Sequence, residues 1–177
     1  MIIWNNKSLA EKMRFLKDHA MSHSERYYHP ELGFNYRMTN VEAALGVAQL
    51  ERVDSFLKRK REIAHNYSKL LKDVPSVDVQ PEADWAKNSY WMYSIVLNKN
   101  AKVKRSALME KLKKLNVDTR PFFIANHLFP YFEKMKKAEK FPIALYLSEN
   151  GINLPSSVLL KDKEITFISQ AIREILQ

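Results

Sequence analysis

The chain has 177 residues, with 29 lysines and arginines against 20 aspartates and glutamates, a net charge of +9, and no cysteine. The absence of cysteine excludes a disulfide framework and a thiolate metal site, and the positive charge favours anionic partners such as nucleic acid, phosphorylated metabolites or nucleotide sugars. Apolar runs are too short for a signal peptide or a membrane span, so we expect a soluble, cytoplasmic protein without a transmembrane segment.

The first elements predicted along the chain are a strand and a helix. Residues 2–4 form a short apolar run that is typical of a strand. Ser8 followed three residues later by Glu11 has the pattern of a capping box, in which two side chains satisfy the free N–H groups at a helix start. This pattern predicts a helix that begins there and continues to about residue 21.

An irregular segment at residues 22–38 separates this helix from the longest helical pattern in the chain. It includes most of the stretch GFNYRMTN, residues 33–40, where successive Asn, Tyr and Arg side chains cannot all face one core. Thr39 followed by Glu42 is a second capping box, worth on the order of 1 kcal/mol. It predicts one long helix, or two helices with a bend near residues 54–55.

After residue 75 the pattern alternates between short strands and helices. The segment YWMYSIVL is aromatic and β-branched, which favours a strand. We expect strands or extended segments at 77–79, 90–97, 117–123 and 152–154, and helices at 104–115, 140–150 and 162–176. Interleaved strands and helices of this kind predict the α/β fold class, in a two-layer α+β arrangement.

Two basic clusters and a group of three histidines each have a chemical and a structural interpretation that compete. The basic clusters at 58–61 and 111–114 fall on predicted helices, where a solvated helix face explains them at least as well as an anionic partner. His19, His23 and His29 could suggest a metal site, but their spacing matches no helical i, i+4 pair. We predict no metal site, and the chain contains no Walker loop, dinucleotide fingerprint, zincin motif or nucleophile elbow.

Five segments in the same order resemble the DegT/DnrJ/StrS family of pyridoxal-phosphate-dependent sugar aminotransferases. They are SLAEKMRFLKDHAMS, GFNYRMTN with the helix that follows it, NSYWMYSIVL, TRPFFIANHLFPYF and GINLPSS. The resemblance covers the whole chain and implies the carboxy-terminal part and small domain of a fold-type I aminotransferase. It divides the chain into the end of the large domain with a long connecting helix, residues 1–72, and a small α+β domain, residues 73–177.

The resemblance assigns the GFNYR loop to a cofactor site. In such enzymes the loop reaches across a dimer interface, where its Asn, here Asn35, binds the cofactor phosphate of the neighbouring subunit. An amide donor suits this task because phosphate oxygens only accept hydrogen bonds. Arg37 could add charge there or stabilise the loop. The alternative is that Arg37 pairs with a local carboxylate and Asn35 merely makes a turn.

The resemblance also implies a substrate site near the segment that follows residue 120. Asn126 and His127 resemble residues that line the sugar-nucleotide pocket, with Arg120 and Tyr90 as further substrate-binding candidates. A hydrogen-bonded interior histidine is an equally good interpretation of His127.

One departure from the family pattern concerns catalysis. The family holds pyridoxal phosphate on a lysine that precedes a Gly-Glu-Gly-Gly turn, and in full-length relatives this turn comes immediately before the strand that MIIWNN resembles. No lysine of this chain has those neighbours, so we expect no catalytic residue, no covalently bound cofactor and no transamination by the chain alone.

The sequence leaves three functions open. The leading one is the carboxy-terminal portion of an aminotransferase that moves an amino group from glutamate to a nucleotide-linked keto sugar in polysaccharide biosynthesis. The second is a non-catalytic remnant that binds nucleotide sugars or an aminotransferase subunit, and the third is a basic nucleic-acid-binding module, which lacks a recognition-helix signature. We expect a homo-oligomer or a separate large-domain partner chain, because the strand at 2–4 and the long helix would leave apolar surface uncovered.

Overall fold

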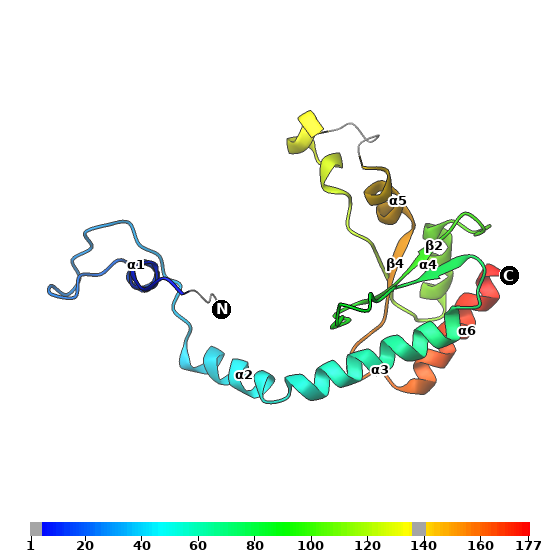
Figure 1. Cartoon of the computed structure of the whole chain (residues 1–177), viewed down its shortest axis with the longest axis horizontal. Coiled ribbons are helices and arrows are strands. Elements are labelled where there is room, and N and C mark those ends of the chain that lie inside the picture. Colours follow the sequence, from blue (N-terminus) through cyan, green and yellow to red (C-terminus); the bar gives the residue numbers. More distant parts are fainter. Residues whose placement is uncertain (1–4, 136–140) are drawn as a thin grey trace. The chain divides into compact units, whose positions relative to one another are not determined.

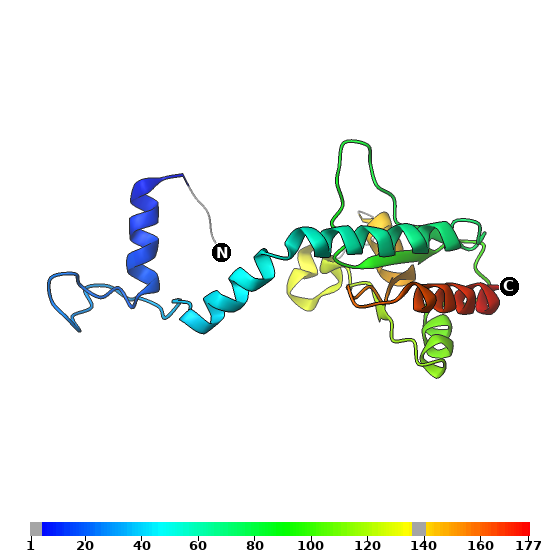
Figure 2. The ribbon, with the colours of Figure 1, turned by 90° about the horizontal axis from the view of Figure 1, so that it is seen from below.

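A computed structural model describes residues 5–135 and 141–177 (Figures 1 and 2), so the strand predicted at residues 2–4 lies outside the described residues. The chain forms two compact units, Met1–Arg52 and Val53–Gln177. Within the described ranges no helix combines the length and the apolar character needed to cross a membrane. The predicted division at residue 72 concerns the domains of a complete enzyme and stays a prediction, whereas the contacts inside this chain group the long helix with the second unit.

The first unit begins with helix α1, Lys7–Lys17. The predicted capping box at Ser8 is wrong, because the side chain of Asn6 caps the helix by accepting a hydrogen bond from the Leu9 N–H at 3.0 Å. Ser8 therefore lies inside the first turn. The helix ends at Lys17, earlier than predicted, because the chain turns there and His19 adopts a positive φ of 61°.

Helix α2, Asn40–Leu50, starts where the sequence predicts. Thr39 and Glu42 form the reciprocal capping box, since the Thr39 side chain accepts from the Glu42 N–H and the Glu42 carboxylate accepts from the Thr39 N–H. A turn at residues 51–52 separates α2 from helix α3, Val53–Leu71. This confirms the two-helix alternative, with the break just before the predicted bend.

The second unit contains a four-stranded antiparallel sheet in the order β1-β2-β4-β3. Its strands are β1 Val77–Val79, β2 Tyr93–Leu97, β3 Arg120–Pro121 and β4 Gly151–Leu154. Residues of β2 alternate between buried and half-buried, because one face of the sheet packs on the core. The segment between β1 and β2 is a long loop that projects past α3 (Figure 2).

Helices α3 and α6 pack against each other along the sheet, with α4 beside α6 (Figures 1 and 2). Among the described residues this unit also contains α4 Arg105–Lys114, the short 3-10 segments η1 Asn126–Leu128 and η2 Pro130–Met135, α5 Pro142–Asn150 and α6 Asp162–Leu176. The predicted apolar stripe of α6 is confirmed, because Ile165, Ile168 and Ile172 are buried. Tyr67 and Tyr93 stack at 4.9 Å between ring centroids in the same core.

This arrangement confirms the α/β fold class in its two-layer α+β form. Each fully buried large apolar side chain contributes about 1.5–3 kcal/mol to the stability of such a core. Helix α5 contacts β2, β3 and β4, and its Tyr146 lines a cavity with Ser94 and Val96, the half-buried residues of β2. The helix therefore covers part of the outer face of the sheet. The other part of that face, near the ends of β3 and β4, contributes to the candidate site.

Candidate functional site

The GFNYR loop packs closely against the end of α1. The Phe34 N–H donates to the Leu16 carbonyl at 2.8 Å, and the Tyr36 N–H donates to the Lys17 carbonyl at 2.9 Å. A side chain at position 33 would meet the backbone of His19 at 2.1 Å, so only glycine allows this approach. The backbone of the loop is therefore held by short-range contacts within the first unit.

The two cofactor-site candidates differ in what they contact. Arg37 forms an ion pair with Asp18 at 3.3 Å, which is the local alternative considered from the sequence. The backbone of Asn35 pairs with that of Asp18 in an isolated β-bridge, and Asn35 is exposed. In the described part of the chain, the Asn35 side chain has no hydrogen-bond partner. Its amide is thus free to donate outward, whereas the guanidinium of Arg37 is already engaged.

Two of the three clustered histidines, His19 and His29, contact each other. His29 Nδ1 lies 2.8 Å from the His19 carbonyl oxygen, and the two rings meet edge to face at 6.4 Å. Residues 5–135 and 141–177 contain no group of three His, Cys, Asp or Glu side chains placed to hold a metal ion.

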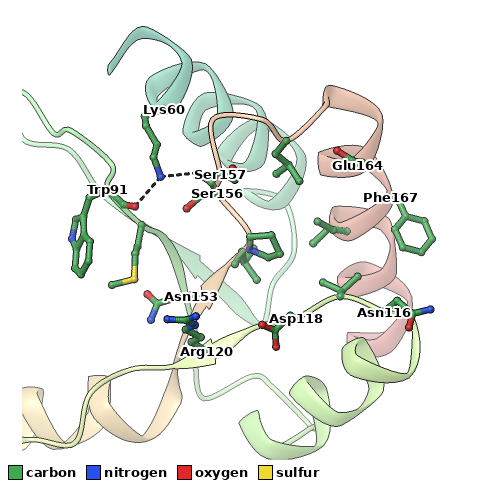
Figure 3. A pocket seen from close by; sticks show the side chains of 16 residues that line it. Lys60, Trp91, Asn116, Asp118, Arg120, Asn153, Ser156, Ser157, Glu164 and Phe167 are labelled. Atoms are coloured by element: carbon green, nitrogen blue, oxygen red, sulfur yellow. Dashed lines mark hydrogen bonds between the residues drawn. The ribbon is translucent and has the colours of Figure 1, made fainter. Parts of the chain in front are cut away.

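In the second unit, a cavity of about 660 Å³ opens where β4 leaves the sheet (Figure 3). Trp91 stands at one wall, Glu164 and Phe167 of α6 at the other, and Arg120 with Asn153 between them. Its remaining lining comes from α3, from the loop before β3, from the loop after β4 and from α6. The cavity therefore combines an aromatic surface, charges of both signs and amide groups.

Lys60 of α3 ties two loops together at this cavity. Its Nζ donates to the Trp91 carbonyl at 2.8 Å and to the Ser156 carbonyl at 2.6 Å (Figure 3). Burial lowers the pKa of Lys60. Because two carbonyl oxygens hold its ammonium group, we assign Lys60 a structural role in positioning the Trp91 and Ser156 segments.

Arg59 and Arg61, on either side of Lys60, also hold loop segments in place. Arg59 donates to the Leu160 carbonyl at 2.5 Å and to Asp162 at 2.9 Å. Arg61 contacts both carboxylate oxygens of Glu82, at 2.7 and 3.0 Å. The cluster at 58–61, for which the sequence suggested a solvated face or an anionic partner, is largely occupied by internal contacts. It therefore provides no argument for a nucleic-acid surface.

Tyr90 belongs to the clamp that Arg61 and Glu82 form at the base of the long loop. Its hydroxyl lies 3.5 Å from Glu82, the Arg61 guanidinium lies 5.7 Å from its ring centroid, and its φ is 46°. The side-chain hydrogen bond from Arg61, together with the Asn88 N–H, lowers the pKa of Glu82 to about 2. The Tyr90 side chain thus helps to fix the loop that carries Trp91.

His127 lies in η1 and is 6% exposed. Its ring stacks on Phe141 at 5.1 Å, and its Nε2 has no hydrogen-bond partner among the described residues. Asn126, the preceding residue, is exposed. Of the four substrate-site candidates, only Arg120 lines the described cavity, so within this unit the structure does not gather them into one site.

Sequence reasoning did not single out Lys60, Trp91 or Asn153 as site residues. Asn153 had a usable signal, because it is the single amide in the short apolar strand Gly151–Leu154. Lys60 had none, since the cluster of four basic residues looks the same whether its members face solvent or loop carbonyls.

Comparisons with known proteins agree with the sequence resemblance. The chain is 38% identical to GDP-perosamine synthase of Vibrio cholerae over 98% of its own length and 47% of that protein. It is also 38% identical to GDP-perosamine synthase of Escherichia coli O157:H7, over 98% of the chain and 46% of that protein. The chain thus spans about half the length of the curated relatives it matches.

Solved structures show the same fold at lower identity. The aminotransferase TlmJ from Streptoalloteichus hindustanus matches with a TM-score of 0.85 at 24% identity, over 97% of this chain and 45% of that one. A putative sugar aminotransferase, Spr1654 from Streptococcus pneumoniae, solved in its PMP form, matches with a TM-score of 0.85 at 20% identity, over 97% and 44%. The family model of the DegT/DnrJ/EryC1/StrS aminotransferases aligns with residues 1–173. Because this match extends over nearly the whole sequence, the chain belongs to the DegT/DnrJ/EryC1/StrS aminotransferase family.

Proposed function

We propose that this chain is the carboxy-terminal portion of a pyridoxal-phosphate-dependent aminotransferase that acts on nucleotide-linked keto sugars, with glutamate as the amino donor. The observation that carries the proposal is the similarity to two GDP-perosamine synthases over 98% of this chain. Both proteins have names that refer to a nucleotide-linked amino sugar. Family membership adds the cofactor, since enzymes of this family depend on pyridoxal phosphate.

The residues present fit part of a pyridoxal phosphate site. Asn35 is exposed on a loop whose backbone is held by α1, so its amide can donate to a phosphate oxygen without first breaking an internal bond. Arg37 would serve as a loop-stabilising residue through Asp18, or add charge after releasing it. When bound, the cofactor supplies the electron sink for amino-group transfer.

The chain by itself should lack the covalent link to the cofactor. Lys60 is the lysine that lines the cavity, and its ammonium group already donates to two backbone carbonyls. No lysine of the sequence stands in the family's catalytic pattern. We therefore expect the catalytic lysine on the part of the complete enzyme that precedes this segment, and no transamination without that part.

The substrate-site assignments belong to this proposal as well. His127 and Asn126 would contact the sugar or the diphosphate, with Arg120 and Tyr90 near them. The unpaired, buried Nε2 of His127 is compatible with a contact that another part of the enzyme or a ligand supplies. Tyr90 would act indirectly, because its hydroxyl already faces Glu82.

The proposal includes a dimer or a partner that carries the large domain. Val41, Leu45, Val47 and Leu50 of α2 are each more than half exposed. An apolar helix surface of this kind marks an interaction site. A cytoplasmic location would fit the absence of cysteine.

Co-expression tests the proposal directly. The amino-terminal half of the Vibrio cholerae relative, supplied as a separate chain, should form a complex with this chain, bind pyridoxal phosphate covalently and restore transfer from glutamate to a GDP-linked keto sugar. The isolated chain should neither bind pyridoxal phosphate covalently nor transfer the amino group. If the isolated chain forms a covalent adduct with pyridoxal phosphate and transaminates, the proposal is wrong.

A pair of variants in the complex tests Asn35. Replacing it by alanine removes one hydrogen bond to a charged group, so we expect roughly 10-fold weaker binding of pyridoxal phosphate. Asn150→Ala, at a half-buried amide of the second unit that donates to the Tyr146 carbonyl, is the control and should leave binding unchanged. Equal affinities of the two variants would remove Asn35 from the phosphate site.

A further inference from the structure

Three polar residues lie in register across neighbouring strands of the sheet. Asn153 of β4 is paired with Ser94 of β2 on one side and with Arg120 of β3 on the other. Their strand neighbours Tyr93, Ile152 and Leu154 point into the core, so the polar row lies on the opposite, outer face. The row ends in the cavity described above, which Asn153 and Arg120 both line (Figure 3).

The orientation of the Asn153 amide is determined by its neighbours. The Ser94 hydroxyl donates to Asn153 Oδ1 at 2.8 Å, which directs Nδ2 toward β3. There Nδ2 makes one long contact, 3.4 Å to the Pro121 carbonyl. Since an amide nitrogen carries two hydrogens, one donor remains without a protein acceptor among the described residues. Asn153 is only 8% exposed, so this donor is held in place by the surrounding structure.

Arg120 adds a second set of donors beside this amide. In the ranges 5–135 and 141–177 its guanidinium has no carboxylate or carbonyl partner. Asp118 lines the same cavity without pairing with it, and Glu164 already accepts from the Lys161 N–H at 2.7 Å. The charge of Arg120 is therefore available to a ligand.

From these observations we infer that Arg120 and Asn153 Nδ2 form a binding site for a small oxyanion, a carboxylate or a phosphate. A planar guanidinium presents a fork of N–H donors that matches both groups, and a fixed amide N–H adds a third direction. The Trp91 indole on the cavity wall offers an apolar surface to the rest of the ligand. Lys60 supports the site by holding the Trp91 and Ser156 segments in place.

The inference deepens the proposed function and rests on it for the choice of ligands. The carboxylates of the amino donor and the phosphates of the nucleotide sugar share the required chemistry. The two sources differ in size and charge, so separate titrations distinguish them.

The test uses the whole chain and three probes: 2-oxoglutarate, GDP and inorganic phosphate, each titrated to about 10 mM so that millimolar dissociation constants are measurable. We expect saturable binding of at least one probe by calorimetry. Arg120→Gln should weaken that binding roughly 10- to 100-fold, because it removes charge-assisted hydrogen bonds. Arg120→Lys should weaken it less, since the ammonium keeps the charge but not the planar fork.

Matched controls separate the site from general electrostatics. Lys113→Gln removes one exposed positive charge from α4, outside the cavity, and should leave the affinity within about twofold because exposed charges are screened. Tryptophan fluorescence gives a second readout. The change in emission on ligand binding should disappear in Trp91→Phe. It should persist in Trp85→Phe, because Trp85 does not line the cavity. Circular dichroism checks that each variant is folded.

The outcomes decide the inference independently of catalysis. Binding of 2-oxoglutarate that depends on Arg120 identifies a carboxylate site, and dependent binding of GDP or phosphate identifies a phosphate site. No saturable binding of any probe, or equal losses in Arg120→Gln and Lys113→Gln, overturns the inference. Because the assay needs neither a partner chain nor pyridoxal phosphate, a failure of co-expression leaves its result unaffected.

Discussion

The two compact units differ in what their apolar side chains contact. In the first, the buried hydrophobic residues among those described are Ala10 and Ala20, and α2 has no buried residue. In the second, side chains from α3, α4, α6 and three strands form a continuous core. Since apolar burial is the main favourable term in folding, the second unit has its own source of stability. In the first, the contacts among the described residues are mainly short-range hydrogen bonds.

This difference determines which sites can be tested on the chain alone. A site on the second unit, such as the cavity beside Arg120, is built on a packed sheet and can be tested on the chain alone. The exposed amide of Asn35 lies on the first unit, and its proposed contact with the cofactor phosphate is to be tested in the complex with a partner chain.

Separating the units gives the largest effect. A fragment of residues 53–177 should fold and unfold cooperatively, because it contains the whole core. A fragment of residues 1–52 should show little stable helix, since isolated helices shorter than about 12–15 residues are marginal in water. Circular dichroism and NMR dispersion measure both. A cooperative transition in the short fragment would contradict the contrast.

Matched truncations of apolar side chains give the next effect. Ile63→Ala removes a fully buried side chain of α3 and should reduce the free energy of unfolding by about 2–5 kcal/mol. Leu45→Ala removes a side chain of α2 that is 64% exposed, and should change the free energy of unfolding by less than about 0.5 kcal/mol. Urea unfolding of the whole chain measures both values. Similar losses would show that α2 is buried in the isolated protein.

The clamp on the long loop predicts a pH-dependent effect smaller than core truncation. The pKa of Glu82 is lowered to about 2 by Arg61 and the Asn88 N–H, below the usual glutamate value of about 4.3. A depressed carboxyl pKa contributes stability that is complete above the unfolded value and is lost as the pH falls toward 2. Glu82→Gln should therefore lower the urea midpoint at pH 7. The difference in urea midpoint between Glu82→Gln and the unmodified chain should become smaller as the pH falls from about 4.3 to 2.

Glu110→Gln is the control for the clamp, because Glu110 forms an exposed ion pair with Lys114 one turn along α4. An exposed helical pair of this kind contributes about 0.3–0.5 kcal/mol. Equal midpoint shifts in the two variants at pH 7 would remove the special role of the clamp.

The smallest effect concerns the start of α2. Thr39→Ala removes the side-chain cap of the reciprocal box and should destabilise the helix by about 1 kcal/mol. Because α2 has no buried residue, global unfolding should hardly change, and the loss should appear as faster amide exchange at Ala43 and its neighbours. Thr166→Ala in α6 is the comparison, since its hydroxyl bonds within an established helix.

The sequence predicted those elements whose signals are local. The Thr39 box placed the start of α2, and the apolar stripe placed the buried face of α6. Where two local signals competed, the prediction failed: Asn6 and Ser8 are both good caps, and Asn6 is the residue used. Site residues were harder, since Tyr90 and His127 were assigned from a resemblance. Their contacts with Arg61 and Phe141 come from other segments of the chain.

The two-layer fold, most element boundaries and the likeness to the family followed from the sequence alone. Those properties depend on side-chain periodicity, caps and motif order, which neighbouring residues specify. Only the tertiary structure decided that Lys60 joins the Trp91 and Ser156 segments, and that Asn153 stands beside Arg120. Strand register and helix packing bring these residues together across many positions of the chain, and composition or spacing carries no information about such pairings.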